Sequence, residues 1–146
     1  MYLDGQNLFS EKQAITAAAV STNVIDTSKA RDIGTGEEFY IMVQVTTSFT
    51  DSGSDSTLAV ALVTDNNESL STPATIRTLV TLPALTAAGT TLFFRIEPQG
   101  LVPFERYIGL SYTPANGNLT TGAITAGIVR NIQKSKNYPA SGYKVT

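Results

Sequence analysis

Apolar and polar residues alternate along the segment FYIMVQVTTS, Phe39–Ser48. Residues 39, 41, 43 and 45 are all apolar and fall on one side of an extended chain, so the period of two predicts a β-strand with that side in the core. The segment STLAVALVT, Ser56–Thr64, repeats the pattern. Because the turn-rich sequence TDSGSDS joins the two segments, we expect them to pair as a β-hairpin.

Five further segments have the composition of strands. The segment Ala14–Asp26 mixes alanines, which favour helix, with β-branched residues, which favour strand, and we expect a strand after a short turn. The Asn116–Gly117 pair is a strong signal for a tight hairpin turn, so the strands on either side of it are also expected to pair. The other expected strands are Ala74–Leu82, Thr90–Ile96, Arg106–Thr113 and Ala123–Ile132.

No long helical pattern separates these segments, which decides how the strands are arranged. Parallel strands need long crossover connections that are usually helical, so the sheets should be antiparallel. We expect an all-β fold, a jelly roll or β-sandwich (or else a barrel), in one domain that spans residues 1–146. Residues 1–13 are expected to form an extended arm, in which the Ser10–Gln13 spacing fits one helical turn, and residues 134–146 a polar tail.

The composition supports a folded domain and argues against nucleic acid and membrane as partners. Apolar residues make up 42% of the chain and charged residues only 15%, whereas disordered chains show the opposite balance. The net charge of −2 and the pI near 5.0 argue against nucleic acid as the main partner. The first residues lack the pattern of a signal peptide and no apolar run is long enough to span a bilayer, so we expect no membrane association.

The sequence contains no histidine and no cysteine. The first absence removes the commonest general base and a frequent zinc ligand, and the second removes thiolate catalysis, cysteine-ligated metals and disulfides. Serine and threonine nucleophiles need an activating base, and no lysine or carboxylate stands at a spacing that supplies one. We therefore expect no enzymatic activity, no cofactor and no metal.

Three loops contain residues that are also found in ligand-binding motifs. The glycines Gly34 and Gly36 lead into a strand rather than a helix, so the loop lacks the helix N-terminus that binds phosphate and should be a turn. The segments Asp51–Ser56 and Thr64–Ser71 carry carboxylates, but neither matches the twelve-residue calcium loop with its closing glutamate. We expect ordinary connections at all three places.

The two ends of the chain carry the strongest candidates for partner contacts. Every charged residue between Arg31 and Arg77 is acidic, whereas every charged residue from Arg130 onward is basic; the pattern is either a solvated surface or a pair of complementary contact faces. Apolar and aromatic residues also lie near both ends, where chains are usually polar, so they dock on the domain itself or on a partner. The candidate contact residues are Tyr2, Leu3, Leu8, Phe9, Lys134, Lys136, Tyr138, Tyr143 and Lys144.

Three segments together resemble a known family. They are LDGQNLFSEKQAITAAAVSTNVIDTSKARDIGTGEE near the start, ERYIGLSYT late in the chain and TTGAITAGIVRNIQKSKNYPASGY at the end. In order and spacing they are similar to the jelly-roll cement (decoration) proteins of tailed phage capsids, in particular those of short-tailed Bordetella-type phages. The middle of the chain contributes little to this likeness.

The resemblance implies a protein on the outer surface of an icosahedral virion that holds neighbouring major capsid subunits together, commonly as a homodimer. Such a protein would be assembled in the host cytoplasm. An alternative from a different class is a carbohydrate-binding or adhesion β-sandwich, in which Tyr40, Tyr107 and Tyr112 would stack on sugars. The absence of tryptophan counts against that alternative.

Overall fold

A computed structural model describes residues 5–28, 39–96, 103–130 and 132 of the chain. Within these ranges the chain forms strands and one short 3₁₀ turn, η1 (Gly5–Asn7), and no α-helix. The strands are β1 (Leu8–Ala14), β2 (Ala19–Val20), β3 (Ile25–Asp26), β4 (Tyr40–Thr50), β5 (Thr57–Asp65), β6 (Ala74–Leu82), β7 (Thr91–Arg95), β8 (Tyr107–Ala115) and β9 (Thr121–Val129).

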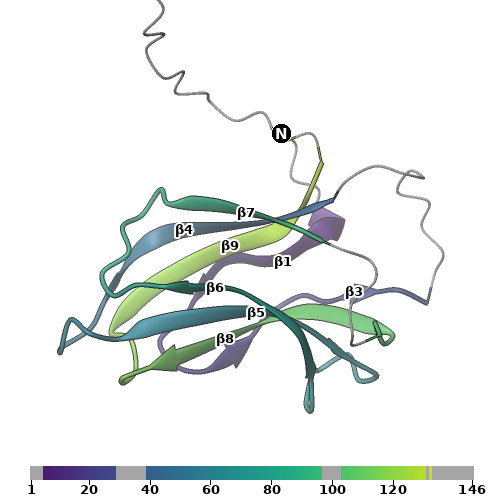
Figure 1. Cartoon of the computed structure of the whole chain (residues 1–146), viewed down its shortest axis with the longest axis horizontal. Coiled ribbons are helices and arrows are strands. Elements are labelled where there is room, and N and C mark those ends of the chain that lie inside the picture. Colours follow the sequence, from purple (N-terminus) through teal and green to yellow (C-terminus); the bar gives the residue numbers. More distant parts are fainter. Residues whose placement is uncertain (1–4, 29–38, 97–102, 131, 133–146) are drawn as a thin grey trace, which may run out of the picture.

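The strands form two antiparallel sheets that pack face to face (Figure 1). The first sheet has the order β1-β9-β4-β7, and the second has the order β2-β8-β5-β6. The short strand β3 also pairs with β8, so β2 and β3 act as one interrupted strand. Each sheet then has four strand positions, and the order is that of a jelly roll, which confirms the predicted all-β class.

The core lies between the two sheets and follows the predicted alternation. On β4 the side chains of Ile41, Val43 and Val45 are at most 1% exposed, and they belong to the same apolar cluster as residues of β5 and β8. Alternate residues of a strand point to opposite faces, so one face of each sheet supplies this cluster. The predicted strand Ala74–Leu82 coincides with β6, and the other predicted long strands overlap β4, β5, β7, β8 and β9.

Both predicted hairpins are wrong. Strands β4 and β5 lie in different sheets, and so do β8 and β9, so neither pair of strands is hydrogen-bonded. Asn116 and Gly117 do have the positive φ angles expected of a tight turn, but residues 116–120 continue from one sheet to the other. Sheets pack about 10 Å apart, and an extended five-residue connection can span about 17 Å, so a short turn can join strands across the core.

The predicted N-terminal arm is wrong for its second half. Residues 8–14 form β1, which pairs with β9 at one edge of the first sheet. Ser10 and Gln13 are hydrogen-bonded through their side chains at 2.6 Å, but in a bulged strand and not in a helical turn. The segment Ala14–Asp26 is only partly extended, since β2 and β3 have two residues each.

A buried polar chain links the two sheets at this edge. The Ser10 hydroxyl lies 2.6 Å from Gln13 Oε1 and 2.7 Å from the hydroxyl of Tyr112, which belongs to β8. A serine has a single O–H, and it donates to Gln13, so the Tyr112 hydroxyl donates to Ser10. Burial raises the pKa of the Tyr112 phenol well above its usual range. The hydrogen bond between Ser10 and Tyr112 therefore joins β1 of the first sheet to β8 of the second.

Candidate partner-binding ends of the sandwich

The directions of the strands divide the connections between two ends of the sandwich. One end, which we call the loop end, carries residues 15–18, 51–56, 83–90 and 116–120. The other end, which we call the terminal end, carries residues 66–73 and the described residues next to each undescribed segment. The start of β1 and the end of β9 meet at the terminal end, where Leu8 pairs with Gly127.

The predicted contact residues fall into two groups. The structure describes Leu8 and Phe9, whereas the other candidates lie outside the described residues, namely Tyr2, Leu3, Lys134, Lys136, Tyr138, Tyr143 and Lys144. So does the predicted turn with Gly34 and Gly36. Leu8 is half-buried, but Phe9 is fully buried in the core between the sheets. The prediction that Phe9 contacts a partner is therefore wrong, because its side chain already packs inside the domain.

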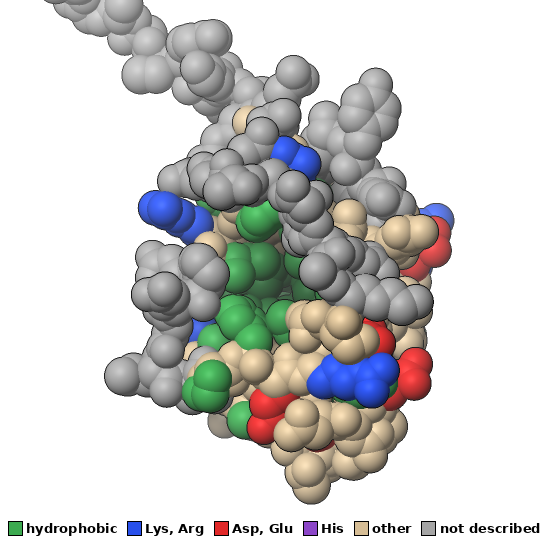
Figure 2. Space-filling model, turned by 90° about the vertical axis from the view of Figure 1, so that its right-hand side faces the viewer, with side chains coloured by type: hydrophobic (Ala, Val, Ile, Leu, Met, Phe, Trp, Pro, Cys, Tyr) green, Lys and Arg blue, Asp and Glu red, His purple; other side chains and the backbone are tan. Residues whose placement is uncertain are grey.

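The terminal end exposes part of the core. Ile25 pairs with Ile108 in the second sheet, while Phe94 and Ile128 flank Ile41 in the first. Six half-buried hydrophobic residues at this end pack against the core cluster, namely Ile25, Phe94, Ile96, Phe104, Ile108 and Ile128. Figure 2 faces this end and shows a hollowed apolar surface in its middle. The described residues thus leave an apolar surface close to where β1 begins and β9 ends.

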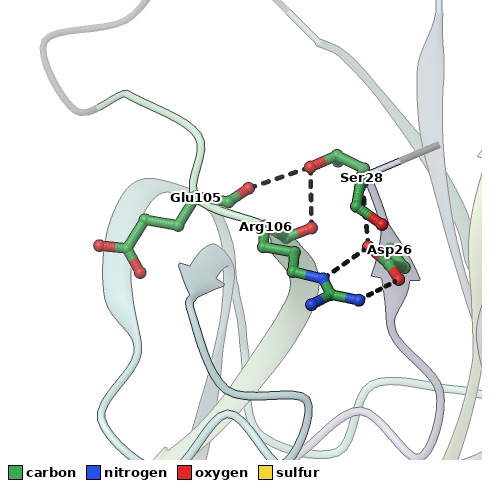
Figure 3. A network of polar contacts seen from close by, with 5 residues as sticks. Asp26, Ser28, Glu105 and Arg106 are labelled. Atoms are coloured by element: carbon green, nitrogen blue, oxygen red, sulfur yellow. Dashed lines mark hydrogen bonds and ion pairs between the residues drawn. The ribbon is translucent and has the colours of Figure 1, made fainter. Parts of the chain in front are cut away.

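A paired arginine lies at the rim of the same end. Arg106 donates from Nε and Nη2 to the two carboxylate oxygens of Asp26, both at 3.1 Å (Figure 3). These hydrogen bonds, with a further one from the Ser28 N–H, hold the pKa of Asp26 well below its usual range. The Arg106 guanidinium also lies 4.9 Å from the centre of the Tyr107 ring. The pair fastens β3 to the start of β8, so this arginine has a structural role.

Two carboxylates of the predicted acidic block hold loops in shape. Asp51 accepts backbone N–H bonds from Gly53, Asp55 and Ser56, at 2.7–2.9 Å. Asp65 is only 6% exposed and accepts the N–H groups of Asn67 and Thr72, which lowers its pKa. Both carboxylates are thus bound to their own loops, and in the described ranges no three acidic side chains gather at a point that could hold a metal. Residues 51–56 connect β4 to β5 and residues 66–73 connect β5 to β6.

We predict that replacing Asp51 by asparagine destabilises the protein in a pH-dependent way. The backbone N–H donors lower the pKa of Asp51 from 3.8 to about 2, so its carboxylate stabilises the fold above pH 4 and loses that effect as the pH falls toward 2. Urea unfolding midpoints of wild type and Asp51→Asn should therefore differ at pH 5.5 and converge as the pH falls below 2. The control is Asp55→Asn, which removes the same charge from the same loop; an equal pH dependence in both variants would contradict the assignment.

The tyrosines proposed for sugar stacking do not form one platform. Tyr112 is fully buried and hydrogen-bonded to Ser10, so it cannot face a ligand. Tyr40 belongs to β4 of the first sheet and Tyr107 to β8 of the second, and each is half-buried. The geometry therefore gives the carbohydrate-binding alternative no assembled site among these residues.

One exposed apolar residue at the loop end was missed from the sequence. Leu85, in the connection between β6 and β7, is 54% exposed. The available signal was the uncharged run from Thr78 to Phe94, which lies between Arg77 and Arg95. Periodicity predicts strands, and it gives no signal for a leucine in a connection.

Comparison with known proteins places the chain among phage proteins. The model of the Bbp16 family matches residues 9–128, which covers all nine strands apart from the first residue of β1 and the last residue of β9. No curated protein matches the chain. None of the helical structure in the described ranges is long and apolar enough to cross a membrane.

Proposed function

Because the chain belongs to the Bbp16 family of Bordetella phage proteins, we propose that it is a capsid cement protein, which binds the outer surface of the icosahedral head and holds neighbouring major capsid subunits together. In this proposal the protein has no catalytic activity and needs no cofactor. It acts on the virion surface, as a homodimer that joins the head in the host cytoplasm, and it binds neither nucleic acid nor membrane.

The observation that carries the proposal is the geometry of the terminal end. Leu8 pairs with Gly127, so the segments that precede β1 and follow β9 depart from neighbouring points. These are the segments that hold Tyr2 and Leu3 on one side, and the basic and aromatic residues from Lys134 to Lys144 on the other. An apolar surface lies beside their points of departure. A contact built from these parts has an apolar centre and a charged periphery, as protein interfaces commonly do.

The proposed action is thermodynamic. A protein that binds the assembled shell but not its separated subunits stabilises the shell by mass action, by an amount that grows with the ratio of free concentration to Kd. A dimer that touches two subunits gains further from the high effective concentration of its second site. Weak individual contacts, repeated over the lattice, are then enough to resist the pressure of packaged DNA.

The test uses shells that lack the protein. We expect removal of residues 133–146 to weaken binding at least tenfold in a co-sedimentation assay, and removal of residues 1–4 to weaken it further. A deletion that extends to residue 9 would be uninformative, because it takes Phe9 out of the core. Thermal unfolding of each truncated form gives the folding control, and Arg77→Gln on β6 is a matched control for the loss of positive charge elsewhere.

Two outcomes separate the parts of the proposal. If the full-length protein does not bind shells, the cement function is wrong. If both truncated proteins bind as tightly as the full-length protein, the function stands and the assignment of its contact residues is wrong.

A further inference from the structure

Leu85 stands apart from the other apolar residues at the surface. It is 54% exposed, and no other large hydrophobic side chain in the described ranges is exposed to a comparable extent. Single exposed leucines are ordinary and need no explanation by themselves. Leu85 calls for one because its backbone conformation, its support and its surroundings all differ from those of an ordinary surface leucine.

The backbone of Leu85 is strained. Its φ of 60° lies in the left-handed region, where the Cβ atom of an L-residue approaches the following carbonyl oxygen. Glycine and asparagine occupy this region readily, and a γ-branched residue rarely does. The protein therefore places a large apolar side chain in water at a backbone position that a smaller residue would fit better. Five described non-glycine residues have a positive φ, among them the buried Leu70, so it is the combination of this backbone conformation with exposure that distinguishes Leu85.

The connection that carries Leu85 is fastened to β4. The Thr86 hydroxyl donates to the carbonyl of Pro83 at 2.6 Å, and the Thr86 carbonyl accepts the N–H of Phe49 at 3.0 Å. Further along, Gly89 donates to the carbonyl of Val45 at 2.8 Å, and the N–H of Ala88 donates to the Ser48 hydroxyl at 2.9 Å. These hydrogen bonds hold the backbone that follows Leu85 against β4.

The chain segment around Leu85 carries no charge. Every residue from Thr78 to Phe94 is uncharged, and Pro83, Ala87 and Ala88 are exposed beside it. A membrane surface or a nucleic acid would require basic residues here, and this segment has none. An uncharged apolar projection on a rigid loop fits an apolar pocket on a protein surface.

We propose that Leu85 is an apolar anchor that enters a pocket on a major capsid subunit. The connection between β6 and β7 lies at the loop end, opposite the terminal end from which β1 begins (Figure 1). Contacts at both ends let one copy bridge two neighbouring capsid subunits. The inference rests on the proposed function, since it takes the shell as the partner, and it adds a second contact that is independent of residues 1–4 and 133–146.

The test exploits the strain at this position. Leu85→Asn should raise the thermal midpoint of the free protein by a few degrees, because asparagine tolerates the left-handed conformation. The same substitution should weaken binding to shells that lack the protein by about tenfold or more, because the buried leucine is lost. Leu85→Gly should also raise the thermal midpoint and weaken binding to shells. Ala87→Asn, which adds the same side chain to an exposed position of the same loop, is the control and should bind nearly as wild type.

A loss of binding in a protein that is more stable cannot come from misfolding, so the two measurements together support the anchor. Equal binding of Leu85→Asn and wild type would overturn the anchor and leave the cement function intact. A change in the oligomeric state of free Leu85→Asn, measured by light scattering, would also overturn it, because Leu85 would then contact a second copy. If wild type itself fails to bind shells, the proposed function fails first and the anchor with it.

Discussion

Replacing Phe9 by alanine should lower the free energy of unfolding by about 3–5 kcal/mol, the usual cost of removing a buried phenylalanine side chain. Phe9 is 0% exposed, and it lies in the same apolar cluster as Ile15, Tyr112 and Ile124. Its carbonyl also accepts the N–H of Asn23, which ties β1 to the segment that crosses to the second sheet. The loss is measured by urea unfolding followed by circular dichroism.

The neighbouring residue gives a matched control. Leu8 is half-buried and points away from Phe9, to the outer face of the first sheet, where it pairs with Gly127. Leu8→Ala should therefore cost much less than Phe9→Ala in the same experiment. If the two variants lose similar stability, or if Phe9→Ala leaves stability unchanged, residues 8 and 9 belong to a detached arm and the core position of Phe9 is wrong.

The strands could be predicted because their signal is local. Alternation over Phe39–Ser48 requires only that one face of a strand is buried, and the structure buries Ile41, Val43 and Val45 as that rule demands. The strand Ala74–Leu82 was predicted to the residue because Pro83 and the threonine-rich sequence mark its end. The all-β class follows from these local signals together.

The pairing of strands could not be predicted, because it depends on contacts between distant residues. The turn at Asn116–Gly117 fixes a local reversal of the chain, but it does not determine whether the next strand joins the same sheet or the opposite one. In the structure β9 lies between β1 and β4, whose residues are far away in the sequence. The same non-local packing decides that Phe9 is inside, although its position near the start suggested a surface role.

The electrostatic roles of the acidic residues could not be predicted from the sequence either. Asp51, Asp55 and Asp65 have the same side chain, and composition treats them alike. The structure separates them by the backbone N–H groups that their carboxylates accept, which lower the pKa of Asp51 and of Asp65. An acidic run in a sequence is thus a poor guide to a contact face, because some of its members stabilise the loops that carry them.

Gly122→Ala is expected to destabilise the protein by about 2–5 kcal/mol, through overpacking combined with backbone strain. Gly122 has a φ of 150°, which L-residues rarely adopt, and a methyl group added there would overlap the ring of Phe49. The ring has little room to move, since Phe49 is 2% exposed and its N–H is bonded to Thr86. The close approach occurs where β9 begins opposite the last residues of β4.

Two other glycines separate the causes of that loss. Gly89 has a φ of 90° with no atom within 4 Å of an added Cβ, so Gly89→Ala measures backbone strain without a clash. Gly5 has open space and no such φ, so Gly5→Ala should change stability by no more than about 0.5 kcal/mol. The order of loss should be Gly122, then Gly89, then Gly5. Because the clash is with a ring, Phe49→Leu in the Gly122→Ala background should cost less than it does in wild type, and equal costs would show that the two side chains do not meet.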